Sequence, residues 1–460
     1  MIVEQYREPM SAASDQHGRR VMDVRAAMPT GCQGAPDVQI VYLVLREGLS
    51  SVFASQVARP LARRAREGFR VHLGVFAPLG QLLRPALRRR WDSLRVAMPP
   101  ELDGRLTILP SPPTRLVWAW DEARTLRWWL RWKYGRGAGL ILHCRNAKMT
   151  AVALRARKRF PNAKVIFDCR GDESMEFAEG HGLDPAAMAD WPLPLRRQYD
   201  RLENTQRSAA SRSDAVFCVS RAMAEELGRR YSLPRDRFTV IPCCTNVDAF
   251  PADPARRARV RERLGLADRF VVAYCGSLEW YQLPDQAIRV FRLIRGLEPK
   301  THFLAITTAP ARMRAALADS GVAPEEATVL SLPPPDVPEH LIASDVGLLL
   351  RRSDGVNRVA APIKFAEYLA SGTPVLLTDG IGDYSAAVRE HGLGAVVNLD
   401  QPDADLAVEL ERFLARQRSR AEELRNACRA YAEDHFSWDR HAEKTRAVYE
   451  SLNAGPRRAP

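Results

Sequence analysis

Short apolar runs alternate along the chain with longer stretches whose apolar residues recur every three or four positions. The short runs are rich in Val, Ile and Leu and lie at 38–45, 71–77, 139–145, 164–172, 215–220, 270–278 and 373–378. Runs of this length are typical of strands that are buried on both faces. Their alternation with helical patterns predicts an α/β protein built on parallel sheets.

One junction combines a basic approach, a helix and a buried strand. Pro362 has the backbone angle favoured at the first position of a helix, and the residues after it have helical spacing up to a Ser-Gly pair. Lys364 and Glu367 therefore fall in the first turns, where free N–H groups and the helix dipole attract phosphate. Lys364 adds a full charge, and Glu367 accepts hydrogen bonds from sugar hydroxyls. The alternative is a plain amphipathic helix whose Lys364 and Glu367 are only solvated.

Polar residues also follow two strands of the amino-terminal half. His143 and Arg145 end the run at 139–145, and Asp168 and Arg170 end the run at 164–172, with Asp172 beside them. Ligands bind at this edge of parallel α/β sheets, so these side chains are candidates for a ligand site. Two alternatives stay open. Asp168 caps the next helix and pairs with Arg170, or His143 is a core histidine with satisfied hydrogen bonds rather than a general base.

The loop after the first strand contains Gly48. It either admits a ligand to the same edge or makes a tight turn.

Length and composition agree with a two-domain cytoplasmic protein. A chain of 460 residues exceeds what one core usually supports, and 46% of its residues are hydrophobic. The eight cysteines show no zinc-binding spacing, which indicates free thiols in a reducing compartment. We expect no metal and no cofactor. Residues 1–36 are polar and lack the apolar core of a signal peptide or membrane span, so we expect a disordered arm.

The formal net charge of +13 indicates an anionic partner. The stretch 114–136 carries five of the nine tryptophans, interleaved with arginine. This mixture suits the boundary of an anionic bilayer, whereas no nucleic-acid recognition motif accompanies the charge, so nucleic acid is not expected. The alternative is that Trp128 and Trp132 face the core while the arginines are solvated.

The segment PIKFAEYLASGTPV at 362–375 resembles the donor-binding signature of GT-B glycosyltransferases, particularly the retaining family 4. The resemblance implies two Rossmann-like domains whose parallel sheets face a central cleft, and it gives Glu367 the role of holding the ribose of a nucleotide sugar. Relatives often have a second glutamate where this chain has Val359. Asp354 and Asn357 are the possible substitutes.

The run at 270–278 and the helical pattern at 285–297 resemble the first strand and helix of the carboxy-terminal GT-B domain. A glycine there lets the backbone approach a diphosphate. Relatives carry an arginine and a lysine in this region, whereas here Glu279, Trp280, Tyr281 and Gln282 follow, so the phosphate charge must be met elsewhere. Arg351, Arg352, Arg358 and Lys364 are candidates, the alternative being an exposed basic loop. The expected donor-binding residues are Gly276, Ser277, Arg351, Arg358, Pro362, Lys364, Glu367 and Tyr368.

Three further segments, 215–230, 238–250 and 435–438, resemble other parts of the family pattern, and the D-x-R-G pattern at 168–171 recurs in relatives. The expected organisation is an arm at 1–36, an acceptor domain at 37–250, a donor domain at 251–430, a helix at 431–452 that crosses back to the first domain, and a disordered tail at 453–460.

The resemblance implies transfer of a sugar from a UDP-, GDP- or ADP-linked donor to a glycan or lipid-linked acceptor, with retention and without metal, in polysaccharide or glycolipid assembly. The expected catalytic residues are Lys364, Asp168 and Arg170, and the expected acceptor side comprises Gly48, His143, Arg145, Asp168 and Arg170. We expect a cytoplasmic protein at the inner face of the membrane. The alternatives are a GT-B nucleotide-sugar epimerase or hydrolase, and a non-catalytic adaptor for membrane or nucleic acid.

Overall fold

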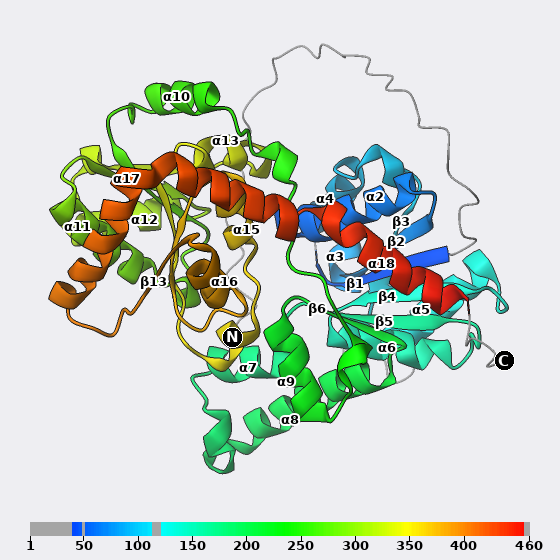
Figure 1. Ribbon diagram of the computed structural model, residues 1–460. Helices are drawn as coiled ribbons and strands as arrows, with labels where there is room; N and C mark the ends of the chain where they lie inside the picture. Colours follow the sequence, from blue (N-terminus) through cyan, green and yellow to red (C-terminus); the bar gives the residue numbers. More distant parts are fainter. Residues whose placement is uncertain (1–38, 48–50, 113–120, 455–460) are drawn as a thin grey trace, which may run out of the picture. The chain divides into compact units, whose positions relative to one another are not determined.

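Seven parallel strands form the first sheet of the computed structural model, which describes residues 39–47, 51–112 and 121–454 (Figure 1). The order is β3-β2-β1-β4-β5-β6-β7. The strands are β1 Gln39–Leu45, β2 Arg70–Pro78, β3 Leu106–Ser111, β4 Leu140–Arg145, β5 Lys164–Cys169, β6 Ala215–Cys218 and β7 Phe238–Val240. The predicted arm at 1–36, Gly48 and the end of the predicted tail lie outside the described residues.

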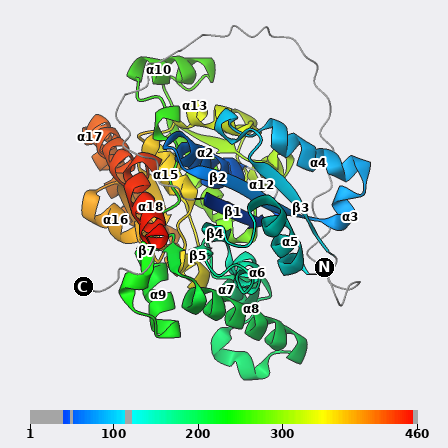
Figure 2. The same ribbon diagram turned by 90° about the vertical axis from the view of Figure 1, so that its right-hand side faces the viewer.

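Alternate residues of each strand in this sheet enter cores on opposite faces. Ile40 and Val44 of β1 pack with Leu61 and Trp91, whereas Val41 packs with residues of α5 and α6 on the other face. The helices of this half are α1 Ser51–Phe53, α2 Arg59–Arg66, α3 Leu79–Leu82, α4 Pro85–Val96, α5 Glu122–Tyr134, α6 Ala147–Arg157, α7 Glu173–Gly180, α8 Leu193–Arg212 and α9 Arg221–Tyr231. Figure 2 shows α6 and α8 side by side, and both are in contact. Burial on both faces explains why the strands read as continuous apolar runs.

Six parallel strands form the second sheet, in the order β10-β9-β8-β11-β12-β13. They are β8 Phe270–Cys275, β9 Thr301–Ile306, β10 Ala327–Leu330, β11 Val346–Leu349, β12 Val375–Thr378 and β13 Gly394–Val397. The accompanying helices are α10 Pro254–Arg263, α11 Pro284–Leu297, α12 Pro310–Asp319, α13 Val337–Leu341, α14 Gly355–Val359, α15 Ile363–Ala370 and α16 Tyr384–His391. The two parallel sheets confirm the predicted α/β fold class.

The last two helices run from the second sheet to the first. Helix α17, Asp403–His435, contains a kink at Arg420, and α18, Trp438–Asn453, follows it directly (Figure 1). Tyr449 of α18 is buried among residues of the first sheet, and its hydroxyl shares a 2.7 Å hydrogen bond with Nδ1 of His143. The carboxy-terminal helix therefore covers part of the first sheet.

Two local expectations differ from the structure. Pro362 has φ −59° and ψ 123°, so it caps α15 from outside the helix and Ile363 is the first helical residue. The alternative in which Trp128 and Trp132 face the core is wrong, because their exposed fractions are 67% and 73%. Trp129 takes the buried place on α5 instead.

Candidate active site

The first turn of helix α15 lies against the glycine turn that follows β8. The Lys364 ammonium group donates a hydrogen bond to Gln282 Oε1, and the Nε2 group of Gln282 donates one to Ser277 Oγ at 2.6 Å. Gly276 has φ +150°, and a Cβ atom added there would collide with the Lys364 ammonium group. The turn therefore needs glycine both for its backbone angle and for the room that Lys364 occupies.

The charges of Lys364 and Glu367 are both weakened by burial. Burial, together with the neighbouring charge of Arg351, lowers the pKa of Lys364 to about 8. Burial raises the pKa of Glu367 to about 7, although the positive charges of Lys364 and Arg59 oppose the rise. An anionic ligand beside Lys364 would supply the countercharge that this site lacks.

Arg351 is the second cation of this group. It is buried, its Nη1 group donates to the Tyr281 carbonyl at 3.0 Å, and its guanidinium lies 4.7 Å from the centre of the Tyr281 ring. Burial lowers the pKa of Arg351, and its Nε atom is buried without a partner among the described residues. Arg352 lies 5.8 Å from the centre of the Trp280 ring. Trp280 and Tyr281 therefore hold two arginines at the same turn.

Three of the expected donor residues are a buried tyrosine, an exposed arginine and a helix cap. Tyr368 is fully buried, and its hydroxyl accepts the Cys275 N–H group at 2.9 Å, so it fixes the end of β8 from the core side. Arg358 is exposed on α14, and Pro362 contributes the cap of α15.

The two possible substitutes for a second glutamate bind each other. Asp354 caps α14 by accepting the Asn357 N–H at 2.7 Å, and both of its carboxylate oxygens also accept the Asn357 side-chain amide. Asn357 is buried. This pair therefore fixes the turn before α15.

Asp168 stands at the centre of a buried polar network at the end of β5. Its Oδ2 atom accepts the Tyr42 hydroxyl at 2.9 Å and lies 3.6 Å from His143 Nε2, and Arg170 is 3.6 Å from Oδ1. Although burial opposes ionisation, the Arg170 guanidinium and the nearby His143 imidazole hold the pKa of Asp168 well below its usual range. The two residues pair, as one of the alternatives supposed, but Asp168 does not cap the next helix, because Asp172 does.

Arg170 and the helical segment after β1 lie between the Asp168 network and the group around Lys364 and Glu367. The Nη2 group of Arg170 donates to Gln56 Oε1 at 2.7 Å, and Gln56 in turn donates to the Cys244 carbonyl at 2.7 Å. Arg59, one turn after Gln56, is the residue whose charge reaches Glu367. A cavity of about 50 Å³ is lined by Tyr42, Gln56, His143, Asp168, Arg170 and residues of α18.

The remaining described residues of the expected acceptor side, Arg145 and His143, are both buried but have different partners. Arg145 is buried and forms an ion pair with Glu47 at 2.7 Å. His143 is buried and its Nδ1 atom shares a hydrogen bond with Tyr449, but its Nε2 atom has no hydrogen-bond partner among the described residues. The alternative of a core histidine with satisfied hydrogen bonds therefore holds for one ring nitrogen only.

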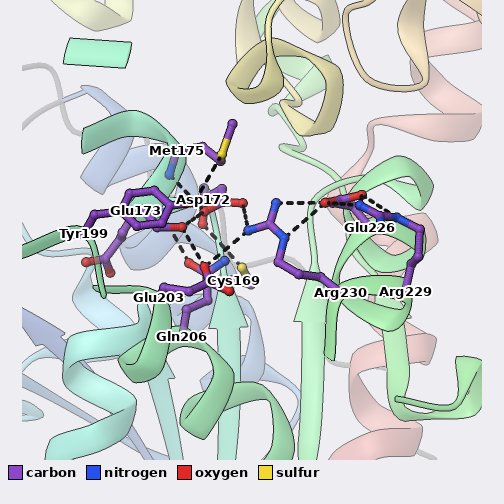
Figure 3. A network of polar contacts seen from close by, with 12 residues as sticks. Cys169, Asp172, Glu173, Met175, Tyr199, Glu203, Gln206, Glu226, Arg229 and Arg230 are labelled. Carbon is purple, nitrogen blue, oxygen red and sulfur yellow. Dashed lines mark hydrogen bonds and ion pairs between the residues drawn. The ribbon is translucent and has the colours of Figure 1, made fainter. Parts of the chain in front are cut away.

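Asp172 has a structural role in a second polar network (Figure 3). Its carboxylate caps α7 by accepting the Met175 N–H at 3.2 Å and pairs with Arg230 at 2.7 Å. Arg230 also contacts Glu226 and Glu203. The network therefore ties α7, α8 and α9 together.

Three residues of the site are not predicted from the sequence, namely Gln282, Gln56 and Arg59. Gln282 lies in the segment where the family resemblance leads one to expect basic residues, and this departure is the only feature of the sequence that marks it. Gln56 and Arg59 lie on a helical segment without a recognised motif, so only the fold shows their neighbours. Within the described ranges no three His, Cys, Asp or Glu side chains form a metal-binding group, and none of the helices there is long and apolar enough to cross a membrane. All seven described cysteines are free thiols.

Two family models match the chain one after the other. Residues 51–249 match Glycosyltransferase Family 4, and residues 256–435 match Glycosyl transferases group 1. The chain belongs to the family 4-like glycosyltransferases of the GT-B fold. This glycosyltransferase is 30% identical over 285 residues to the D-inositol 3-phosphate glycosyltransferase of Acidothermus cellulolyticus, a match that covers 59% of this chain and 60% of the relative.

A second relative is the GDP-mannose-dependent alpha-(1-6)-phosphatidylinositol monomannoside mannosyltransferase of Mycolicibacterium smegmatis. It is 28% identical, and the match covers 49% of this chain and 59% of the relative. The glycosyltransferase thus spans about 60% of the length of the curated relatives that it matches.

Solved structures show the same fold. HepE of Anabaena in complex with UDP has a TM-score of 0.65 at 13% identity, with 90% of this chain and 100% of that chain covered. WaaG, a glycosyltransferase involved in lipopolysaccharide biosynthesis, has a TM-score of 0.62 at 14% identity, with 91% and 100% covered. These likenesses confirm the GT-B fold of the glycosyltransferase.

Proposed function

We propose that this glycosyltransferase moves a sugar from a nucleoside diphosphate sugar to an acceptor hydroxyl, with retention of the anomeric configuration. The observation that carries the proposal is the placement of the Lys364 ammonium group against the Gly276 turn. That turn follows β8, at the edge of a parallel sheet where ligands bind. The family membership and the GDP-mannose-dependent relative support the same donor class.

The chemistry needs stabilisation of the departing diphosphate. When the bond between the anomeric carbon and the phosphate oxygen breaks, the electron pair stays on that oxygen and negative charge grows on the diphosphate. Lys364, Arg351 and the amino-terminal end of α15 supply positive charge at that place, and this stabilisation strengthens as the bond breaks. We assign these three features to the leaving group, without a metal ion.

Glu367 and the first sheet take the remaining roles. Glu367 lies one turn into α15 and accepts hydrogen bonds from the ribose hydroxyls. Arg170 belongs to the acceptor side, because 13% of its side chain remains exposed while its neighbour Asp168 is held by Tyr42 and His143. Asp168 then positions Arg170 rather than touching substrate.

The acceptor is a lipid-linked or membrane-bound glycan in this proposal. Trp128 and Trp132 of α5 are exposed, and their rings stack with centroids 6.4 Å apart. Arginines alternate with these tryptophans along α5. An exposed tryptophan pair among arginines suits an anionic bilayer, so the protein attaches to the inner face of the membrane through this helix.

A thermal-shift screen with UDP, GDP and ADP tests the donor class. The matching nucleotide stabilises the protein by about 2.7 kcal/mol at 100 times its dissociation constant, whereas the other two give smaller shifts. With the sugar donor that the screen selects, NMR of the product shows an unchanged anomeric configuration. A nucleotide-binding protein that consumes donor equally fast without any acceptor would instead be an epimerase or hydrolase, and the absence of nucleotide binding would contradict both functions.

A further inference from the structure

A second basic cavity lies at the opposite edge of the second sheet. Its volume is about 450 Å³, and its lining comes from residues 251–254, from α10, from the Ser-Gly pair after α15 and from the second half of α17. Asp345 directly precedes β11, and its Oδ2 atom accepts the Val271 N–H of β8 at 2.8 Å. The cavity is therefore near the amino ends of these strands, whereas Gly276 and Lys364 lie at the carboxyl ends.

Two arginines of this cavity share one carboxylate, and a third has only backbone carbonyls as partners. Arg257 and Arg261, one turn apart on α10, contact Asp345 at 2.6 Å and 3.0 Å. Arg425 of α17 donates to the backbone carbonyls of Ser344 at 3.0 Å and of Ser371 at 3.1 Å. Within the described part of the chain no carboxylate forms an ion pair with Arg425. The lining also contains Arg429, which pairs with Glu433, and the carboxylates of Asp253 and Glu422. Its four guanidinium groups therefore outnumber its two carboxylates.

The pKa of Arg425 agrees with this excess of positive charge. Burial, followed by the positive charge of Arg257, lowers the pKa of Arg425 to about 10. The guanidinium groups line the cavity, whereas Asp345 is not part of its wall. A guanidinium group pairs with phosphate through two parallel hydrogen bonds, and a buried positive charge without a counterion favours an anion.

We propose that this cavity, which we call the arginine pocket, binds a small anion that carries a phosphate group. The proposal does not rest on sugar transfer, because the pocket and the candidate donor site lie at opposite edges of the sheet. Phosphate enters between α10 and α17 and supplies the countercharge that Arg425 lacks.

A matched pair of substitutions on α17 tests the proposal. Asn426 lines the pocket and is exposed, whereas its exposed neighbour Ala427 is not part of the lining. Asn426→Glu places a carboxylate at the arginines, and Ala427→Glu adds the same charge outside. Both substitutions put a glutamate four residues after an existing one, so their effects on the helix are alike.

Inorganic phosphate is the probe, with chloride at matched ionic strength as its control. Ten times the dissociation constant of phosphate should raise the Tm of the wild type and of Ala427→Glu by about 2 °C. Isothermal titration should show at least about tenfold weaker phosphate binding to Asn426→Glu. Lys364→Ala, which removes the donor-site cation, should keep the response. No response in the wild type, equal responses in both glutamate variants, or loss of the response in Lys364→Ala would each overturn the proposal.

Discussion

Two neighbouring ionisable groups of α15 titrate close to neutral pH. The pKa of Glu367 is raised to about 7 and that of Lys364 is lowered to about 8. Donor binding in the proposed mechanism needs Glu367 without its proton and Lys364 with its proton. Both conditions hold together only between these two values, so the site works in a narrow pH window.

The pH profile of kcat/KM for the donor should therefore be bell-shaped. It should fall below a pH of about 7 as Glu367 gains a proton, and fall above a pH of about 8 as Lys364 loses one. The measurement is initial rates at limiting donor and saturating acceptor. Glu367→Gln should remove the acid limb and leave the alkaline limb, and a wild-type profile that is flat across both values would contradict these assignments.

Gly276→Ala should displace the Lys364 ammonium group from the turn that follows β8. The added Cβ would collide with the Lys364 ammonium group, so we expect nucleotide binding to weaken by at least about tenfold. Isothermal titration measures this loss. Gly104→Ala is the control, because Gly104 also has a positive φ of +66° but open space around its Cβ position. If both variants bind nucleotide like the wild type, Lys364 does not depend on this turn.

At the scale of elements, α5 shows where sequence patterns are ambiguous. Apolar residues occur on both sides of this helix, so its spacing alone did not decide which side is buried. Leu126, Trp129 and Leu130 pack in the core, and Trp128 and Trp132 lie outside. By contrast, the sequence predicted α15 and β12 closely. The Ser-Gly pair ends the helix sharply, and an apolar run as short as β12 fits a strand that is buried on both faces.

The exposed tryptophan pair should mediate attachment to anionic vesicles. In flotation with phosphatidylglycerol vesicles, Trp128→Ala combined with Trp132→Ala should weaken binding by at least about tenfold, because both rings leave water on insertion. Added salt should release the wild type, since exposed charge attraction is screened. Trp280→Ala is the control, an exposed tryptophan outside α5. Salt-insensitive binding, or unchanged binding of the double variant, would remove α5 from the membrane contact.

At the scale of the whole molecule, the sequence predicted the two parallel sheets but not the contacts between distant segments. Lys364 and Gln282 are 82 positions apart, and His143 and Tyr449 are 306 positions apart. Such pairs depend on the packing of complete elements, which no local pattern encodes. Glu367 and Lys364 could be proposed together from the sequence because one helix carries both, whereas the partners of Asp168 come from β1, β4 and the loop after β5.

The proposed reaction assigns the charge on the diphosphate to protein groups, so removal of divalent metal should leave the rate unchanged. We expect equal turnover before and after dialysis against excess EDTA, measured with the donor selected by the nucleotide screen. A loss that Mn²⁺ or Mg²⁺ restores would move the leaving-group role from Lys364 and Arg351 to a metal ion.

Separate substitutions of Lys364 and Glu367, followed by kinetics and nucleotide titration, test the donor site most directly. Lys364→Ala removes a charge whose effect grows as the bond breaks, so turnover should fall by about 10² or more. Glu367→Gln keeps the shape but loses the anionic acceptor, so nucleotide binding should weaken by about 1 to 3 kcal/mol. Melting temperatures should stay unchanged, because both side chains are half-buried and burial disfavours the charge that each substitution removes. Wild-type turnover and nucleotide affinity in both variants, with unchanged melting temperatures, would show that α15 is only structural and that the donor binds elsewhere.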